Sequence, residues 1–288
     1  MTEVHTVKAN GIEFAYLEEG SGPLVLLMHG FPDNAHTWDR QMPVLAEAGY
    51  RAVAPFIRGY PPTEIPHGGY YDGATLATDV RALIEALGDA PAFLVGQDWG
   101  AFITYAACAA YPESVKCAVA MAVPLPRAVL RLMEIPEQVH HSFHWWFFQA
   151  RGIPEVAVRA NDFAFIDYLW RLWEPGFDDG AHVADVKRML AEPGALEAAL
   201  GYYRAAMDPA LADPALADVR AHLLDDISVP TLAIFGAGDP RAEFAKTQEE
   251  HFTGGYRAEI LDGCAHFLHR SRPAEVGRLI LEWLGEHS

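Results

Sequence analysis

The sequence has few basic residues and no long apolar run, and both shortages exclude classes of function. It contains 21 Lys and Arg against 39 Asp and Glu in 288 residues, which gives a formal net charge of −18. Binding to nucleic acid or to an anionic membrane surface needs clustered basic side chains, so we expect neither partner. The longest apolar runs, such as PLVLLM and CAVAMAV, have the length of a strand and are too short to cross a membrane.

Cysteine is also scarce. The chain has three cysteines, Cys108, Cys117 and Cys264. An odd number without zinc-binding spacing is typical of free thiols in a reducing compartment. The N-terminal segment MTEVHTVKANGIEF lacks the apolar core of a signal peptide. We therefore expect a cytoplasmic protein, and none of the motifs described below implies a metal or an organic cofactor.

The first half of the chain alternates between strand and helix patterns. Short apolar segments predict strands, namely IEFAYLEEG, PLVLLM, RAVAPF, AFLVG and KCAVAMAV. Helical periodicity predicts helices over 36–50, 72–88 and 99–111, which end near a glycine or just before a proline. This alternation predicts an α/β fold with a mostly parallel central sheet and helices on both faces.

The pattern changes after residue 124. From 125 to 226 the strand signals disappear, and aromatic-rich helical segments such as HHSFHWWFFQ, FAFIDYLWRLW and LEAALGYYRAAM replace them. Strands return with PTLAIFG and YRAEILDG, and the chain closes with the helical segment PAEVGRLILEWLG. We therefore predict a discontinuous α/β core, residues 1–124 and 227–288, interrupted by a helical cap over 125–226.

The segment FLVGQDWGAF, residues 93–102, predicts a strand, a sharp turn and the start of a helix. Asp98 is at the centre of the turn, and Gly96 and Gly100 bracket it. Glycines in these two places suit a strained turn that presents a nucleophile, because larger side chains would collide there. The ordinary alternative is a loop in which Asp98 only caps the helix.

Three other features favour the catalytic interpretation. Asp239 follows the strand TLAIFG and His266 follows the strand AEIL, so both come, like Asp98, at the edge where open α/β sheets place their sites. The motif HGFP, residues 29–32, follows the strand PLVLLM. The chain order of nucleophile, acid and histidine is that of the α/β-hydrolases.

The sequence resembles the α/β-hydrolase superfamily over nearly its whole length. HGFP, GxDWG and the late histidine resemble its epoxide hydrolase and dehalogenase branches, which use an aspartate nucleophile and a helical cap. The resemblance implies that Asp98 is the nucleophile, His266 the base and Asp239 the acid that orients it. It also implies an oxyanion hole formed by the backbone N–H groups of Phe31 and Trp99.

Some of these assignments have competitors. Asp239 could be an ordinary turn residue before Pro240, and His269 lies three residues beyond His266. The G-x-x-H motif of the family selects His266. His29 is interpreted as a structural hydrogen-bonding residue of the HGFP loop.

An aspartate nucleophile suits attack on a saturated carbon. Aspartate has a reference pKa of about 3.9, so it needs no base for the first step. The product is an ester, which water can cleave once His266 takes a proton from it. The oxyanion of that second step forms on Asp98 and is stabilised by the two backbone N–H groups.

The resemblance also implies hydrogen-bond donors from the cap, which stabilise the group that leaves when Asp98 attacks. GYYRAAMDP resembles the second tyrosine motif of epoxide hydrolases, and the alignment selects Tyr203 rather than Tyr202. SFHWWFFQ has no tyrosine where the first is expected, but a bacterial branch uses a histidine in a similar setting, and His144 matches it. The ordinary alternative for His144 is an aromatic packing face of the cap.

Some residues resemble the epoxide hydrolase branch and others the dehalogenase branch. Haloacetate dehalogenases place an arginine directly after the nucleophile, and here that residue is Trp99. Gln97 and Trp99 resemble haloalkane dehalogenases, whereas HGFP and YYRA favour the epoxide hydrolases. We predict an epoxide hydrolase, with a dehalogenase as the alternative and a non-catalytic ligand-binding α/β-hydrolase as the third hypothesis.

The aromatic content of the cap predicts the kind of substrate. We expect a small apolar or aromatic molecule in contact with Trp99, Trp145 and Phe147, between cap and core. Dimerisation is common in such folds, so a homodimer is retained as an expectation.

Overall fold

The computed structural model describes residues 3–88, 91–128 and 134–288. In this part of the chain eight strands form one sheet in the order β1-β2-β4-β3-β5-β6-β7-β8. The pairs β1/β2 and β2/β4 are antiparallel and the other neighbours are parallel. The strands are β1 Val4–Ala9, β2 Ile12–Gly20, β3 Leu24–Met28, β4 Arg51–Pro55, β5 Ala92–Gln97, β6 Val115–Met121, β7 Thr231–Gly236 and β8 Tyr256–Leu261.

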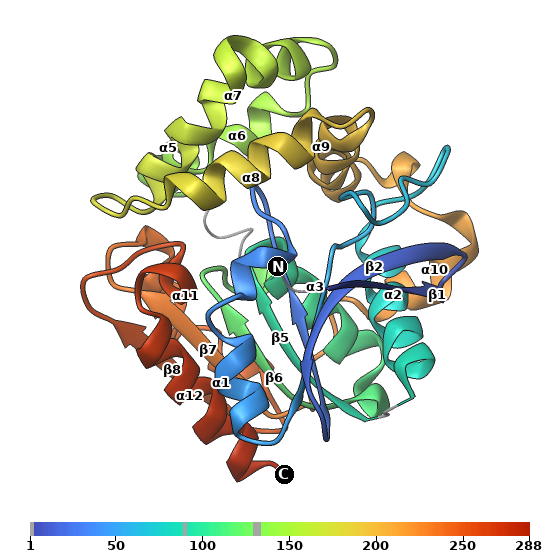
Figure 1. The fold of residues 1–288 in the computed structure, drawn as a ribbon, viewed down its shortest axis with the longest axis vertical. Coiled ribbons are helices and arrows are strands. Elements are labelled where there is room, and N and C mark those ends of the chain that lie inside the picture. The colour runs from blue at the N-terminus through green and yellow to red at the C-terminus, as the bar shows by residue number, and fades with distance from the viewer. Residues whose placement is uncertain (1–2, 89–90, 129–133) are drawn as a thin grey trace.

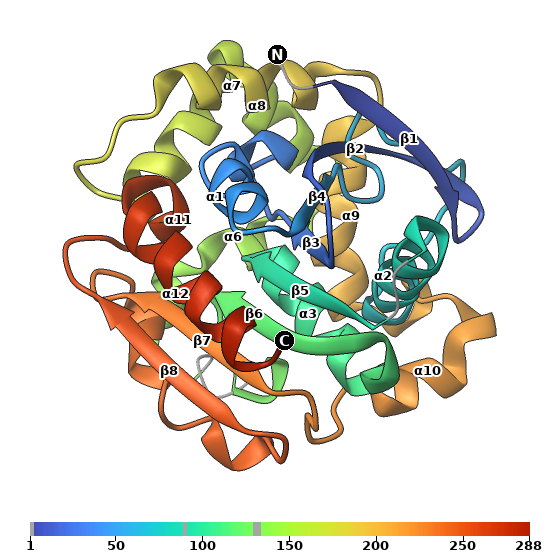
Figure 2. The same ribbon diagram turned by 60° about the horizontal axis from the view of Figure 1, so that its bottom comes forward.

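Helices cover both faces of the sheet, with α1 and α12 on one side and α2 and α3 on the other (Figure 2). The longest of these, α2, is stabilised at both ends. The Asp72 carboxylate accepts a hydrogen bond from the N–H of Ala74, and Gly88 ends the helix in the left-handed region with φ 83°. The helices of the core are α1 Met42–Glu47, α2 Gly73–Leu87, α3 Trp99–Ala110, α11 Leu268–Ser271 and α12 Pro273–Glu286.

A helical insertion lies between β6 and β7, and its helices α5 to α9 sit at one end of the sheet (Figure 1). The predicted fold class and the helical insertion are thereby confirmed, while the limits 125 and 226 of a separate cap stay a prediction. The helix α7 is interrupted at 160–163, where the backbone leaves the right-handed helical conformation. The helices between β6 and β7 are α5 Pro136–His141, α6 Phe143–Phe147, α7 Ile153–Trp173, α8 Gly180–Ala191, α9 Ala195–Met207 and α10 Ala217–His222.

Two details differ from the sequence-based expectation. The strand β1 was not predicted, because its residues alternate between exposed and partly buried positions at the edge of the sheet. The single helix predicted over 36–50 is wrong: a short 3-10 helix, Ala35–Trp38, is followed by α1, which starts at Met42 with Pro43 in its first turn. Proline suits the first turn of a helix and not its interior, which explains the division.

The sheet brings the predicted site residues to one edge. Asp98 follows β5, Asp239 follows β7 by three residues, and His266 follows β8 by five. These strands are neighbours or near neighbours and run parallel, so their carboxyl ends meet on the side of the sheet that faces the helical insertion (Figure 1). Within the described residues, no helix combines the length and the apolar character needed to cross a bilayer.

Candidate active site

Asp98 sits on a strained turn between β5 and α3, with φ 54° and ψ −119°. A Cβ at Gly96 would lie 2.1 Å from the carbonyl oxygen of Gly100, and a Cβ at Gly100 would lie 1.9 Å from that of Met28. Neither position therefore accepts a side chain. A Cβ at Gly30 would likewise lie 2.4 Å from the Cβ of Asp98, so the HGFP loop packs directly against the turn. Such an arrangement fixes the carboxylate at the edge of the sheet.

The HGFP loop donates to this carboxylate. The backbone N–H of Phe31 makes a 2.9 Å hydrogen bond to Oδ1 of Asp98. His29 has the structural role expected for it: its Nε2 accepts from the N–H of Ile57 at 3.1 Å, and its Nδ1 bonds the carbonyl of Gly30 at 2.9 Å. Among the described residues, the N–H of Trp99 makes no hydrogen bond to the Asp98 carboxylate, and its role as the second donor stays a prediction.

His266 lies between the two predicted acids and is fully buried. Its Nε2 is 3.3 Å from Oδ2 of Asp98, and its Nδ1 is 3.4 Å from Oδ2 of Asp239. Apart from this approach to Asp98, Nε2 has no hydrogen-bond partner among the described residues. The structure thus brings the three predicted residues together, with His266 between Asp98 and Asp239.

The loop that carries His266 is anchored by neighbouring elements. The Glu174 carboxylate, just after α7, accepts hydrogen bonds from the N–H groups of Ala265 at 2.9 Å and Phe267 at 2.7 Å. The amide of Gln97 donates to the His266 carbonyl at 3.1 Å. Since Gln97 directly precedes Asp98, it links the turn that carries Asp98 to the loop that carries His266.

Arg241, which the sequence analysis did not single out, contacts both Asp239 and His266. The buried guanidinium of Arg241 donates from Nε to Oδ1 of Asp239 at 2.9 Å and from Nη2 to Oδ2 at 2.7 Å. The same Nη2 also lies 2.8 Å from Nδ1 of His266. A sequence reading has little chance of finding this contact, because an arginine in a turn after Asp-Pro is usually exposed.

These contacts change the proton affinity of both partners. Burial by itself would raise the pKa of Asp239, but the Arg241 cation holds it well below its usual value. Burial and then Arg241 lower the pKa of His266, but the attraction of the Asp239 and Asp98 carboxylates outweighs both. The pKa of His266 therefore lies above its ordinary value in the free protein.

Two polar groups of the cap lie above the triad. Tyr203 of α9 and His144 of α6 are buried, and their rings lie 5.4 Å apart, edge to face. Among the described residues, neither the Tyr203 hydroxyl nor Nδ1 of His144 has a hydrogen-bond partner. A buried polar group left without a partner is costly, so both are poised for a ligand.

The environment fixes the protonation of both cap groups. Burial, and then the charge of Asp98, raises the pKa of Tyr203 well above its usual value, so the phenol keeps its proton. Burial, and then Arg241, lowers the pKa of His144 well below its usual value, so the imidazole is neutral. Both are therefore uncharged groups that can donate a hydrogen bond.

The residues predicted to bind substrate divide into two groups. Trp99 stacks on Trp145 with ring centroids 5.3 Å apart, and both rings pack edge to face on Tyr203. Phe147 instead stacks on Phe165 at 5.7 Å, within the cap. The two tryptophans thus lie beside the predicted donors, whereas the contacts of Phe147 are those of a packing residue.

Trp173, at the end of α7, was not predicted as a site residue. Its ring lies 5.2 Å from that of His266 and 4.7 Å from that of His144. Its buried indole N–H has no hydrogen-bond partner among the described residues. An aromatic stripe is usually packing, so its sequence alone carries no signal for this position.

The competing residues lie elsewhere. Nε2 of His269 bonds the hydroxyl of Thr37 at 2.6 Å, and the hydroxyl of Tyr202 bonds the carbonyl of Arg58 at 2.6 Å. The side chains of His269 and Tyr202 are therefore engaged in structural contacts. The three cysteines are buried free thiols.

Cap side chains make hydrogen bonds to the loop after β3, among them those at Pro32 and Asp33. The indole N–H of Trp170 donates to the carbonyl of Pro32 at 3.0 Å, and its ring stacks on Phe267 at 3.7 Å. Asp33 accepts a 2.6 Å hydrogen bond from Nε2 of His182 on α8. The cap therefore contacts the core directly beside the predicted oxyanion hole.

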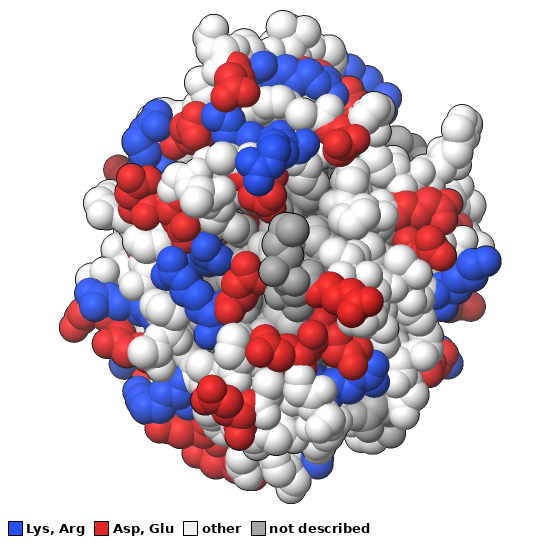
Figure 3. Space-filling view, in the orientation of Figure 1, with Lys and Arg blue, Asp and Glu red and all other residues white. Residues whose placement is uncertain are grey.

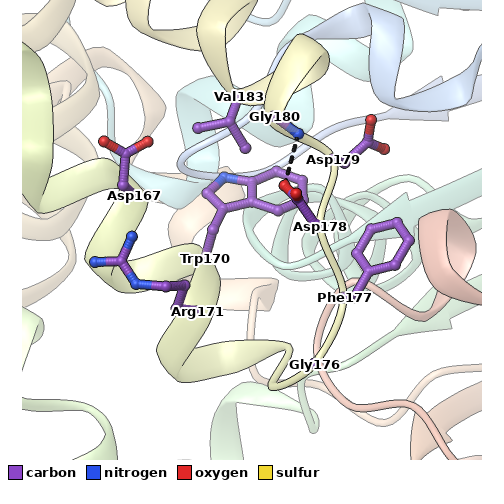
Figure 4. Close-up of a pocket in the computed structure, with 9 residues that line it drawn as sticks. All are labelled: Asp167, Trp170, Arg171, Gly176, Phe177, Asp178, Asp179, Gly180 and Val183. Atoms are coloured by element: carbon purple, nitrogen blue, oxygen red, sulfur yellow. Dashed lines mark hydrogen bonds between the residues drawn. The ribbon is translucent and has the colours of Figure 1, made fainter.

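A pocket beside Trp170 contains none of the predicted site residues. Trp170 lies in its wall, and residues from both ends of the α7–α8 connection surround it (Figure 4). The residues that line it are Asp167, Trp170, Arg171, Gly176, Phe177, Asp178, Asp179, Gly180 and Val183.

The described part of the face in Figure 3 mixes Lys and Arg with Asp and Glu and shows no continuous basic surface.

Comparison with known proteins places the chain in a family. Residues 23–173 match the family model described as alpha/beta hydrolase fold. The chain is 32% identical over 285 residues to an AB hydrolase superfamily protein, YfhM, of Bacillus subtilis, covering 96% of each. It is 32% identical over 316 residues to Epoxide hydrolase A of Mycobacterium tuberculosis, again covering 96% of each. Epoxide hydrolase VrEH1 of Vigna radiata has a similar structure, with TM-score 0.81, 26% identity and coverage of 99% of this chain and 98% of that one.

Proposed function

The chain belongs to the epoxide hydrolase branch of the α/β-hydrolase superfamily, and from this premise we propose that it converts small apolar or aromatic epoxides to vicinal diols. The reaction passes through an ester on Asp98. The observation that supports this most strongly is the division of the Asp98 carboxylate: Oδ1 is bound by the Phe31 N–H, while Oδ2 faces Nε2 of His266.

In the first step Oδ2 of Asp98 attacks one epoxide carbon. A C–O bond forms to the aspartate as the C–O bond of the ring breaks, and the electron pair of that bond goes to the epoxide oxygen. The protonated phenol of Tyr203, assisted by the neutral ring of His144, donates to this oxygen. Trp99 and Trp145 are the proposed contacts of the apolar part of the substrate.

In the second step water attacks the carbonyl carbon of the ester. His266 takes a proton from the water, and Asp239 stabilises the imidazolium that forms. The oxyanion develops on Oδ1, where the Phe31 N–H already points and where the N–H of Trp99 is the proposed second donor. The bond between the carbonyl carbon and the alkyl oxygen then breaks, and the imidazolium gives its proton to that departing oxygen. The second proton of the water restores the phenol of Tyr203, so the Asp98 carboxylate is regenerated and the diol is released.

A dehalogenase is the second candidate. The observation in its favour is the stacked pair Trp99 and Trp145 beside the nucleophile, because indole N–H groups suit a leaving halide. A non-catalytic ligand-binding role is the third candidate, and the joint presence of the nucleophile turn, the histidine and the HGFP donor argues against it.

A substrate panel separates the three candidates. Styrene-type epoxides, alkyl halides and haloacetates are incubated with the protein, and diol and halide are quantified. The proposal expects diol from the epoxides and little halide from the other two groups. Halide release without diol formation supports the dehalogenase, and no turnover in any group supports the ligand-binding role.

A further inference from the structure

In a catalytic triad the histidine makes the short hydrogen bond to the acid. Here Arg241 makes the short hydrogen bonds to Asp239 instead. Both oxygens of Asp239 accept from the guanidinium, at 2.9 Å and 2.7 Å. The Nδ1 atom of His266 is 3.4 Å from Oδ2 of Asp239 but only 2.8 Å from Nη2 of Arg241. The closest polar neighbour of Nδ1 is therefore a cation that can only donate.

This geometry determines where the proton of a neutral His266 sits. A guanidinium has five N–H donors and no acceptor, so a 2.8 Å contact to Nδ1 requires a lone pair on that nitrogen. The single ring proton is then on Nε2, which faces Oδ2 of Asp98 at 3.3 Å. A histidine that accepts a proton from water through Nε2 needs the opposite tautomer, with its proton on Nδ1 and directed to the acid.

We infer that Arg241 is a positioning residue: it holds the resting His266 in the Nε2–H tautomer and must release Nδ1 before the ring can act as a base. The change moves no net charge, because the ring loses the proton on Nε2 and gains one on Nδ1. The tautomer of His266 does not depend on the proposed two-step reaction; only its effect on the rates of the two steps rests on that reaction. Ester formation, which needs no base, is independent of Arg241, whereas ester hydrolysis depends on it.

The other groups around His266 do not provide an alternative donor to Nδ1. Asp98 faces Nε2, and Glu174 binds the backbone on either side of the ring. The cap contributes neutral or weakly basic groups. Burial, and to a smaller extent the charge of Arg241, lowers the pKa of His141 to about 4. The titratable and charged groups that surround the ring are Asp98, Asp239, Arg241, His141, His144, Glu174 and Tyr203.

The direct test reads the tautomer in the protein without substrate. Nitrogen-15 NMR of the imidazole distinguishes a protonated from an unprotonated ring nitrogen, and His266→Gln identifies the signals. The wild-type protein is expected to carry the proton on Nε2, and Arg241→Met is expected to move it to Nδ1, where Asp239 accepts it. Arg278→Met, an exposed arginine paired with Glu282 on α12, is the matched control and should leave the tautomer unchanged.

A wild-type ring protonated on Nδ1 overturns the inference, and so does a folded Arg241→Met protein that keeps the wild-type tautomer. If Arg241→Met does not fold, the wild-type tautomer alone decides. These outcomes do not depend on any substrate, so a failure here is distinct from a failure of the proposed function.

Kinetics supply the second readout. Above the pKa of His266, Arg241→Met should accelerate hydrolysis of the ester on the order of tenfold, as expected for loss of one hydrogen bond to a charged group. The rate of ester formation should stay near the wild-type value. Slower hydrolysis in the folded variant, at the same pH, contradicts the inference and assigns Arg241 the simpler role of holding Asp239.

Discussion

The backbone N–H of Phe31 donates a 2.9 Å hydrogen bond to Oδ1 of Asp98. This contact joins the loop after β3 to the turn after β5 and distinguishes the two oxygens of one carboxylate. Oδ2 is left facing His266 at 3.3 Å. One oxygen is thereby placed for attack on a substrate and the other for stabilisation of an oxyanion, which is the arrangement that the proposed ester mechanism needs.

Asp98→Ala should abolish turnover and leave the fold intact. Asp98 is the side chain that the strained turn presents, and no other group beside it on the turn can form the ester. Diol formation and circular dichroism are measured together. Residual activity above about one per cent of wild type, which is large against the losses that follow removal of catalytic groups, would remove Asp98 from the mechanism.

Tyr203→Phe should slow ester formation by a factor on the order of 10² or more, since an alkoxide leaving group needs a proton donor. His144→Gln should have a similar cost. The single-turnover rate of ester formation on the best epoxide is the measurement. Tyr202→Phe is the matched control, because its hydroxyl bonds the carbonyl of Arg58 instead of facing the site.

Trp99→Phe separates the epoxide hydrolase from the dehalogenase. A halide leaves as a stable anion and needs only a donor such as an indole N–H, so a dehalogenase should lose much of its rate in this variant. An epoxide hydrolase should be affected less by Trp99→Phe than by Tyr203→Phe. If the rate on the best epoxide is insensitive to Tyr203→Phe, the dehalogenase becomes the better account.

Asp33 should stabilise the protein in a manner that depends on pH. Burial alone would raise its pKa, but His182 and its other basic neighbours lower the pKa of Asp33 below its ordinary value, to about 2. The stabilisation from the ionised form is therefore fully present above about pH 4 and is lost as the pH falls through about 2. A shift of this size corresponds to roughly 2 kcal/mol.

Urea unfolding of wild type and Asp33→Asn between pH 6 and pH 2 measures this contribution. The wild-type advantage should disappear towards the acid end. Asp225→Asn, which removes an exposed Asp–His pair with His222, serves as the control and should change stability little at any pH. An advantage of wild type over Asp33→Asn that persists unchanged to pH 2 contradicts the assignment.

The fold could be predicted from the sequence where periodicity was strong. The amphipathic pattern of α2 has the helical period, and the buried run of β5 has the length of a strand and is followed by the glycine-bracketed turn. The strand β1 was missed because an edge strand with polar residues gives a weak pattern. The break before α1 was missed because the apolar periodicity continues across 39–41, although the helix stops there and a new one starts at Met42.

The site was predictable only in part, for a physical reason. Asp98, Asp239 and His266 each follow a strand, and parallel strands bring their carboxyl ends together. The positions of Arg241 and Trp173 depend on tertiary packing around the ring of His266, beside which both side chains lie. No local spacing encodes that contact, so a buried cation on the triad could not be foreseen.

The most direct test of the central claim is the mass of the peptide that contains Asp98 in His266→Gln after exposure to an epoxide substrate. This variant retains the nucleophile and its Phe31 donor but lacks the base that activates water. We expect one equivalent of substrate mass on that peptide. His269→Gln, corrected for its folded fraction, should turn over normally and accumulate none, because His269 contacts Thr37 rather than Asp98. An unmodified Asp98 peptide in His266→Gln, under conditions where binding of the epoxide is demonstrated, would contradict the ester mechanism.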